Sequence, residues 1–124
     1  MILIDTNIII WWLENPYQLP DSVRLEIENP NQPIYYSVAS LWEIGIKKKK
    51  GKLKISDDYL DFLDQEQFEV LNINRPHVLK VSELDLIHND PFDRIIIAQA
   101  ITEGLTIITS DKIFEKYPVN LLKI

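Results

Sequence analysis

The segment from residue 88 to residue 111, HNDPFDRIIIAQAITEGLTIITSD, constrains the fold more than any other part of the chain. Asp90 and Asp93 flank a proline, which is favoured at the first position of a helix, and acids stabilise the first helical turn. The residues 95–100, IIIAQA, are almost wholly apolar. The pattern therefore predicts a helix, capped by Asp90, that other structure must cover.

A buried strand is predicted after this helix, and a further aspartate follows the strand. Gly104 supplies the left-handed residue that closes many helices. Residues 105–109, LTIIT, form a mostly β-branched run that is typical of a strand covered on both faces. Asp111 comes where the carboxyl end of that strand should lie.

Each of these aspartates also has a purely structural explanation. An aspartate at the N-cap or in the first turn stabilises a helix by about 0.3 to 2 kcal/mol. A single aspartate of this kind is therefore no evidence of a catalytic or metal-binding function. Only several acids that converge on one point would indicate a functional site.

Strands and helices alternate along the whole chain. This alternation favours an α/β fold with a parallel sheet of about five strands and helices on both faces. The predicted strands are 1–4, 34–37, 68–73, 105–109 and 119–123. The predicted helices are 8–13, 21–28, 38–49, 57–65, 76–84, 91–103 and 112–117.

Two acids are predicted to meet at one rim of this sheet. Asp5 follows the first strand and Asp111 follows the fourth, and ligand sites of open α/β sheets lie at the carboxyl ends of strands. If the two strands are neighbours they run ~4.8 Å apart, which brings both aspartates together.

Glu43 lies in the predicted helix 38–49. The apolar residues of this helix, which include Trp42, cover much of its circumference, so we expect the helix to be largely buried. Glu43 falls at the border of that apolar surface. An ordinary pair with Lys47, in the favourable i, i+4 order, explains Glu43 without any function. A carboxylate on this border could equally point into a cleft at the sheet edge.

Length and composition indicate one globular domain, residues 1–124, because 46% of the residues are hydrophobic. Cysteine is absent, which excludes disulfides and thiolate metal sites. The N-terminus lacks the pattern of a signal peptide, and no apolar stretch approaches the ~18 residues of a membrane span. We therefore expect a cytoplasmic protein without a membrane partner.

The net charge of −6 opposes a nucleic-acid partner at first sight, since phosphate contacts need Lys and Arg. However, six of the 13 basic residues lie in the run KKKKGKLK at 47–54. A solvated helix end explains such a run as well as phosphate binding does. The candidate RNA contacts are Lys47, Lys50, Lys52 and Arg94.

The remaining aromatic and histidine residues favour structural roles. Trp11 and Trp12 fit core and helix packing better than a partner groove. His77 is expected to be solvated or packed, because no second His or Cys lies at ligand spacing. His88 stands closer to the acids but is also expected to be structural.

Three ordered segments, LIDTNIIIWWL, ASLWEIGIKKKKGKL and HNDPFDRIIIAQAITEGLTIITSDKIFEKYPV, resemble the PIN-domain family, specifically the VapC-type toxins of bacterial toxin–antitoxin pairs. The likeness runs from Leu3 to Val119. It implies a three-layer α/β/α sandwich, a ribonuclease that depends on Mg²⁺ or Mn²⁺, a homodimer, and inhibition by a cognate antitoxin. One departure is Asn89, where relatives often have arginine.

The resemblance also implies a set of site residues. The family's four acids, expected to bind metal and to be catalytic, fall on Asp5, Glu43, Asp93 and Asp111. A second tier comprises Asp90, Thr6, Asn7, Thr109 and Ser110, where either Thr109 or Ser110 occupies the family's polar position at the strand end.

The chemistry of these residues agrees with that set. Two unit charges ~4 Å apart repel by about 4 kcal/mol at an effective dielectric of ~20, so gathered acids need a cation or bound protons. Oxygen donors without Cys or paired His favour Mg²⁺ or Mn²⁺. The hypothesis is RNA phosphodiester hydrolysis by metal-activated water, which leaves a 5′-phosphate and a 3′-hydroxyl, as the resemblance implies.

Two other classes of function stay open at this point. The chain could be a catalytically inactive PIN-like module that binds metal or RNA without turnover. It could also be a phosphatase-like or receiver-type domain, which gathers acids at strand ends too. That reading needs a lysine on a later strand, and Lys112 beside Asp111 is a poor substitute.

Overall fold

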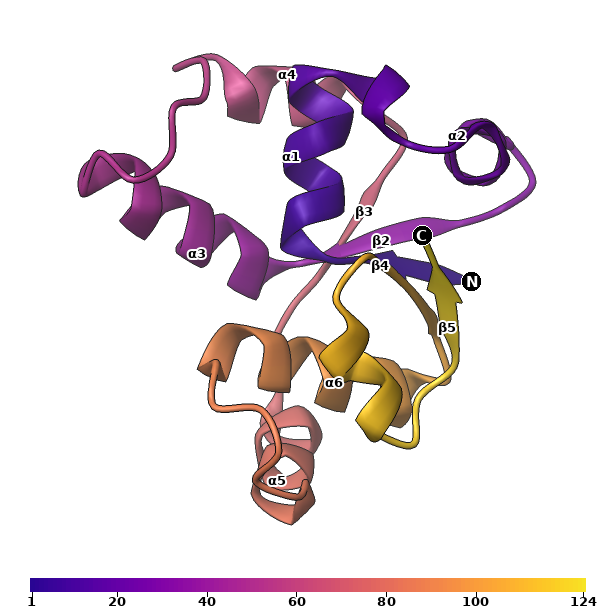
Figure 1. The fold of residues 1–124 in the computed structure, drawn as a ribbon, viewed down its shortest axis with the longest axis vertical. Helices are drawn as coiled ribbons and strands as arrows, with labels where there is room; N and C mark the ends of the chain where they lie inside the picture. The colour runs from indigo at the N-terminus through magenta and orange to yellow at the C-terminus, as the bar shows by residue number, and fades with distance from the viewer.

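The computed structural model describes the backbone of residues 1–124 and every side chain except that of Lys123. Its centre is one five-stranded sheet of order β3-β2-β1-β4-β5, in which all four neighbouring pairs are parallel (Figure 1). The strands are β1 (Ile2–Ile4), β2 (Ile34–Ser37), β3 (Glu69–Leu71), β4 (Thr106–Thr109) and β5 (Leu121–Lys123).

Helices cover both faces of the sheet. Figure 1 shows α1 to α4 on one side and α5 and α6 on the other. The α-helices are α1 (Thr6–Glu14), α2 (Asp21–Glu28), α3 (Val38–Lys49), α4 (Tyr59–Gln65), α5 (Arg75–Glu83) and α6 (Pro91–Glu103). Two 3₁₀ turns, η1 (Pro16–Gln18) and η2 (Lys112–Lys116), complete the connections.

The alternation of side chains along the strands divides the interior into two cores. Ile4 of β1 and Ile108 of β4 pack with the first four helices, whereas Leu3 and Ile107 pack with α6 and η2. Successive residues of a strand point to opposite faces, so each central strand serves both cores. The predicted parallel sheet of about five strands in a three-layer α/β/α sandwich is therefore confirmed.

Several predicted boundaries were wrong by a few residues. Helix α1 begins at Thr6 rather than at residue 8, because the carboxylate of Asp5 caps it by accepting from the N–H of Ile8. The last strand begins at Leu121 rather than at residue 119, because the N–H of Val119 is used in a turn. Strand β3 is also shorter than the predicted 68–73.

The expectation that helix α3 is largely buried was wrong on one side. Trp42 is 64% exposed, and its ring forms a T-shaped contact with the ring of Phe92 at a centroid distance of 5.0 Å. A 3.6-residue period leaves room for a solvent-facing apolar residue on a helix covered elsewhere. Trp11 and Trp12, in contrast, pack partly buried against the core, as predicted.

Among the described residues, no helix has both the length and the apolar character needed to cross a membrane.

The central position of Leu3 predicts a large stability cost for its truncation. Leu3 is fully buried in β1, and Leu3→Ala should lower the free energy of unfolding by about 2 to 5 kcal/mol, through lost transfer energy and a residual cavity. Urea unfolding measures this cost. Leu25→Ala on α2, where the side chain is 66% exposed, is the matched control and should stay within about 0.5 kcal/mol of wild type. Equal effects would contradict the assigned core.

Candidate metal centre

The pairing of β1 with β4 brings the two strand-end aspartates together. Ile4 lies opposite Ile108 in the parallel register, and the N–H of Asp5 donates to the carbonyl of Ile108 at 3.2 Å. Asp111 stands two residues after the end of β4 and caps η2 through the N–H of Ile113. The predicted neighbourhood of these strands is confirmed.

A small polar cavity of about 130 Å³ opens at this rim. It contains all four acids that the resemblance assigned, together with three residues of the second tier and one lysine. Its lining residues are Asp5, Thr6, Asn7, Glu43, Lys47, Asp90, Asp93 and Asp111.

Thr109 connects Asp5 to Asp111. Its buried hydroxyl donates to Oδ2 of Asp5 and accepts from the backbone N–H of Asp111, at 3.0 Å for the second bond. Ser110 lines a separate cavity on the far side of Asp111. Of the two alternatives for the polar position at the strand end, this geometry favours Thr109.

Glu43 enters the cavity from α3. The residue is only 5% exposed, and its Oε2 accepts from Nζ of Lys47 at 2.7 Å, while its Oε1 is buried without a hydrogen-bond partner among the residues that the structure describes. Thr6 of α1 meets Ser40 of α3 through their hydroxyls at 2.9 Å, which ties the two helices together beside Asp5. The expected i, i+4 pair of Glu43 therefore exists and leaves one carboxylate oxygen free.

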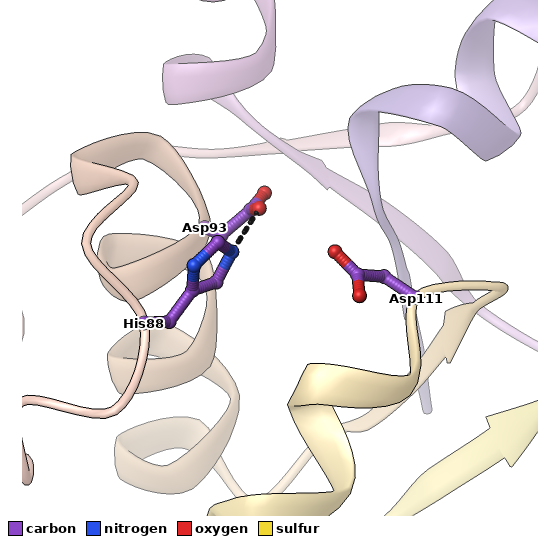
Figure 2. A group of neighbouring side chains, drawn as sticks. All are labelled: His88, Asp93 and Asp111. Atoms are coloured by element: carbon purple, nitrogen blue, oxygen red, sulfur yellow. Dashed lines mark hydrogen bonds and ion pairs between the residues drawn. The ribbon is translucent and has the colours of Figure 1, made fainter.

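Asp93 enters from the first turn of α6. Asp90, the N-cap of that helix, accepts from the N–H groups of Phe92 and Asp93 with one oxygen. Oδ2 of Asp93 lies 2.7 Å from Nε2 of His88, and Figure 2 shows the carboxylate of Asp111 facing this pair across the opening. Ligand atoms of His88, Asp93 and Asp111 all lie within 4.8 Å of one another.

The pKa values of two of these acids are raised, which shows the electrostatic cost of gathering carboxylates in one place. Burial raises the pKa of Asp5 from 3.8 to about 6, and the charges of Asp111 and Glu43 add to the rise. Burial likewise raises the pKa of Asp93 to about 6, with repulsion from Asp90 and Glu43. Hydrogen bonds from Thr109 to Asp5 and from His88 to Asp93 oppose these shifts. Without a metal, Asp5 and Asp93 therefore keep their protons to a pH well above the ordinary range of carboxylates.

The donor set fits a hard divalent cation. Buried polar atoms are normally hydrogen-bonded; Oε1 of Glu43 has no partner among the described residues, and a cation in the cavity would satisfy it. The surrounding donors are carboxylate oxygens, which suit Mg²⁺ and Mn²⁺. Asp5, Asp93, Glu43 and Asp111 are the residues that would hold such an ion.

The predicted basic residues divide into three groups. Lys47 lines the cavity, and its hydrogen bond to Glu43 raises its pKa. Lys50 and Lys52 are exposed around the end of α3.

Arg94 does not fit the predicted RNA contact. It is 8% exposed, and its guanidinium donates to the carbonyls of Val81, Leu84, Asp85 and His88. A buried guanidinium committed to backbone carbonyls holds the chain before α6 in place and has no free face for a phosphate. Nothing in the sequence around Arg94, which follows the acidic start of the helix, indicated that it holds the chain before α6 in place.

The two histidines differ from one another. His77 is fully buried, where it completes the cap of α5 with Asn74 and contacts Glu103, which agrees with packing rather than ligation. His88 lies within the acidic group, so its expected purely structural role was too narrow. The only sequence signal was its position five residues before Asp93.

The fold and this acidic rim define an α/β protein with a candidate divalent-metal centre at the carboxyl edge of a parallel sheet. The family model of the PIN domain matches residues 2–120, nearly the whole chain. The chain belongs to the PIN domain family. Because the family is established, the receiver-type and phosphatase-like alternatives are set aside.

Known relatives agree with this assignment. Ribonuclease VapC22 of Mycobacterium tuberculosis is 23% identical over 114 residues, which cover 90% of this chain and 87% of that protein. The structure of VapBC2 from Rickettsia felis bound to a promoter DNA fragment superposes with a TM-score of 0.75 at 24% identity, covering 99% of this chain and 98% of that one. A toxin–antitoxin complex from Klebsiella pneumoniae gives 0.68 at 21% identity, with full coverage of both chains.

The raised pKa values predict how metal-free stability depends on pH. A carboxyl whose pKa is about 6 when folded and 3.8 when unfolded binds its proton more tightly in the native state. Its stabilising contribution is complete below about pH 4 and is lost as pH rises through about 6. In EDTA, Asp5→Asn should therefore gain stability relative to wild type by roughly 1 to 3 kcal/mol between pH 4.5 and 7.5.

Urea unfolding of both proteins at the two pH values measures this difference. Addition of Mg²⁺ or Mn²⁺ at pH 7.5 should remove the advantage of Asp5→Asn, because the ion stabilises the ionised wild-type cluster. A stability difference that does not change with pH would contradict the charge repulsion assigned to Asp5.

Proposed function

We propose that this protein is a metal-dependent endoribonuclease and the toxin of a toxin–antitoxin pair. The observation that carries the proposal is the convergence of Asp5, Glu43, Asp93 and Asp111 on one cavity, with an unpartnered Glu43 oxygen. The relative named a ribonuclease supports RNA as the substrate. Such an enzyme acts where cellular RNA is, in the cytoplasm.

The residues of the chain have distinct roles in this proposal. Asp5 and Asp93 are the main ligands of a Mg²⁺ or Mn²⁺ ion, and Glu43 and Asp111 hold the ion or orient the attacking water. A divalent ion at this place supplies an acidified water and neutralises charge that develops on the phosphate. Thr109 fixes the rotamer of Asp5 through its hydroxyl, and Lys47 keeps Glu43 aimed into the cavity.

The exposed lysines after α3 are proposed as phosphate contacts outside the cavity. Lys50 and Lys52 are exposed to solvent directly after α3, the helix that supplies Glu43. Lys48 is committed to Asp57 and to the carbonyl of Ile55, so it is not part of this surface. Phosphate contacts of this kind position RNA without reading its sequence.

Removal of either main ligand should abolish cleavage while the fold persists. Asp5→Asn and Asp93→Asn should each lower the cleavage rate by about 100-fold or more, because the ion contributes several kcal/mol and ~1.4 kcal/mol is a factor of ten. Gel analysis of total RNA incubated in Mg²⁺, Mn²⁺ or EDTA measures this loss.

Asp61→Asn, at an exposed position of α4, is the matched control and should cleave like wild type. Cleavage that persists in EDTA or in both ligand variants would overturn the assignment. If wild type binds metal but cuts no RNA in any of these conditions, the alternative of a PIN-like module without turnover replaces the enzyme.

We also propose a homodimer and an antitoxin partner. The toxin–antitoxin complex named among the structural relatives supports the antitoxin. For the homodimer, the sequence favours Trp11, Trp12 and the apolar helices, and both of these tryptophans pack partly buried against the protein's own core. The exposed Trp42 borders an apolar groove on α3 with Leu41 and Ile46, and that groove is the proposed dimer contact. Large exposed aromatic groups are common in such interfaces.

Loss of Trp42 should separate the dimer. Trp42→Glu should convert a dimeric wild type into a monomer in light scattering after size exclusion, because a charge in an apolar contact is left without a partner. Leu25→Glu changes an equally exposed residue of α2 and should leave the dimer intact. A monomeric wild type, or a Trp42→Glu protein that stays dimeric, would contradict the proposed surface.

A further inference from the structure

His88 has no role in the function proposed above, yet it touches the metal centre. It lies in the loop between α5 and α6, with Nε2 at 2.7 Å from Oδ2 of Asp93 (Figure 2). The contact is short and partly buried, since the two side chains are 17% and 18% exposed. A distance of this size requires a hydrogen between the two atoms, because two bare lone pairs would repel.

The position of His88 is fixed by contacts that do not involve the acids. Its backbone N–H donates to the hydroxyl of Tyr117 at 2.8 Å, and its carbonyl accepts from the guanidinium of Arg94 at 3.2 Å. Its ring meets the ring of Phe114 in a tilted, edge-type contact at 6.4 Å. The packing of the loop therefore places the imidazole of His88 beside Asp93.

Tyr117 and Arg94 in turn belong to a buried network. The hydroxyl of Tyr117 donates to the carbonyl of Asp85 and accepts from Arg94, whose guanidinium also reaches the carbonyls of Val81 and Leu84. Tyr117 and Arg94 both form hydrogen bonds with the loop that carries His88. The network makes that loop rigid at the point where it meets the metal centre.

We infer that His88 is a positioning residue of the metal centre: its Nε2–H donates to Oδ2 of Asp93 and turns Oδ1 toward the ion. The terminal torsion of an aspartate is broad, so a hydrogen bond is needed to fix its carboxylate. Groups that orient a metal-binding carboxylate in this way typically change metal affinity by 10 to 100-fold. The inference rests on the proposed metal site and not on turnover.

One alternative is that Nε2 itself binds the ion together with Asp93 and Asp111, whose ligand atoms are all within 4.8 Å of one another. The two roles exclude one another, because an Nε2 that donates its hydrogen to Asp93 has no lone pair for a metal. The two roles also predict different metal preferences, since imidazole favours Mn²⁺ and softer ions over Mg²⁺.

Calorimetric titration of the intact protein with Mg²⁺ and with Mn²⁺, in the absence of RNA, tests the inference. His88→Leu removes the donor and should weaken binding of both ions by about 10 to 100-fold. His88→Gln retains an N–H at similar reach and should recover most of the affinity for both ions. The melting temperature in EDTA should change little in the Gln variant, which separates metal affinity from folding.

His77→Gln is the matched control, because His77 is a buried histidine of α5 that contacts Glu103 at the end of α6 and is not among the residues that line the cavity. It should bind both ions like wild type. Wild-type affinity in His88→Leu would overturn the inference, as would a His88→Gln protein that loses Mn²⁺ binding while keeping Mg²⁺ binding. A wild type that binds neither ion would overturn it too, whereas absent RNA cleavage with normal metal binding affects only the proposed enzyme.

Discussion

The parallel pairing of β1 with β4 is the constraint on which the candidate site depends. It places Asp5 beside the end of β4, and Thr109 then joins Asp5 to Asp111 through one buried hydroxyl. The helices bring the other two acids to the same rim, Glu43 from the body of α3 and Asp93 from the first turn of α6. Each acid therefore stands on a helix or just after the end of a strand.

This arrangement carries an electrostatic cost that a cation would relieve. Burial and repulsion from neighbouring acids hold the pKa of Asp5 and of Asp93 at about 6, and one buried oxygen of Glu43 has no partner in the described part of the chain. Helix capping alone does not require such a cluster, because an acid at an exposed helix end caps the helix without the cost of burial. The strain in the charge distribution is the physical argument for a metal centre.

Much of this could be predicted from the sequence, because the signals were local. The β-branched run at 105–109, Gly104 and the proline between Asp90 and Asp93 fixed the helix and strand around which the sheet is ordered. The four acids followed from strand ends and from the family resemblance, and the cavity brings all four together. Which of Thr109 and Ser110 occupies the polar position at the strand end became clear only from the directions of their side chains in the structure.

The remaining features depended on contacts between distant parts of the chain. Arg94 was predicted to contact RNA from its charge, but the carbonyls that bury it lie 6 to 13 residues away. Trp42 was expected inside because hydrophobic periodicity does not reveal which side of a helix stays uncovered.

The most direct test of the metal centre is an anomalous difference map from crystals grown with Mn²⁺. We predict a peak between Asp5 and Asp93, and a map without density in this cavity would contradict the account.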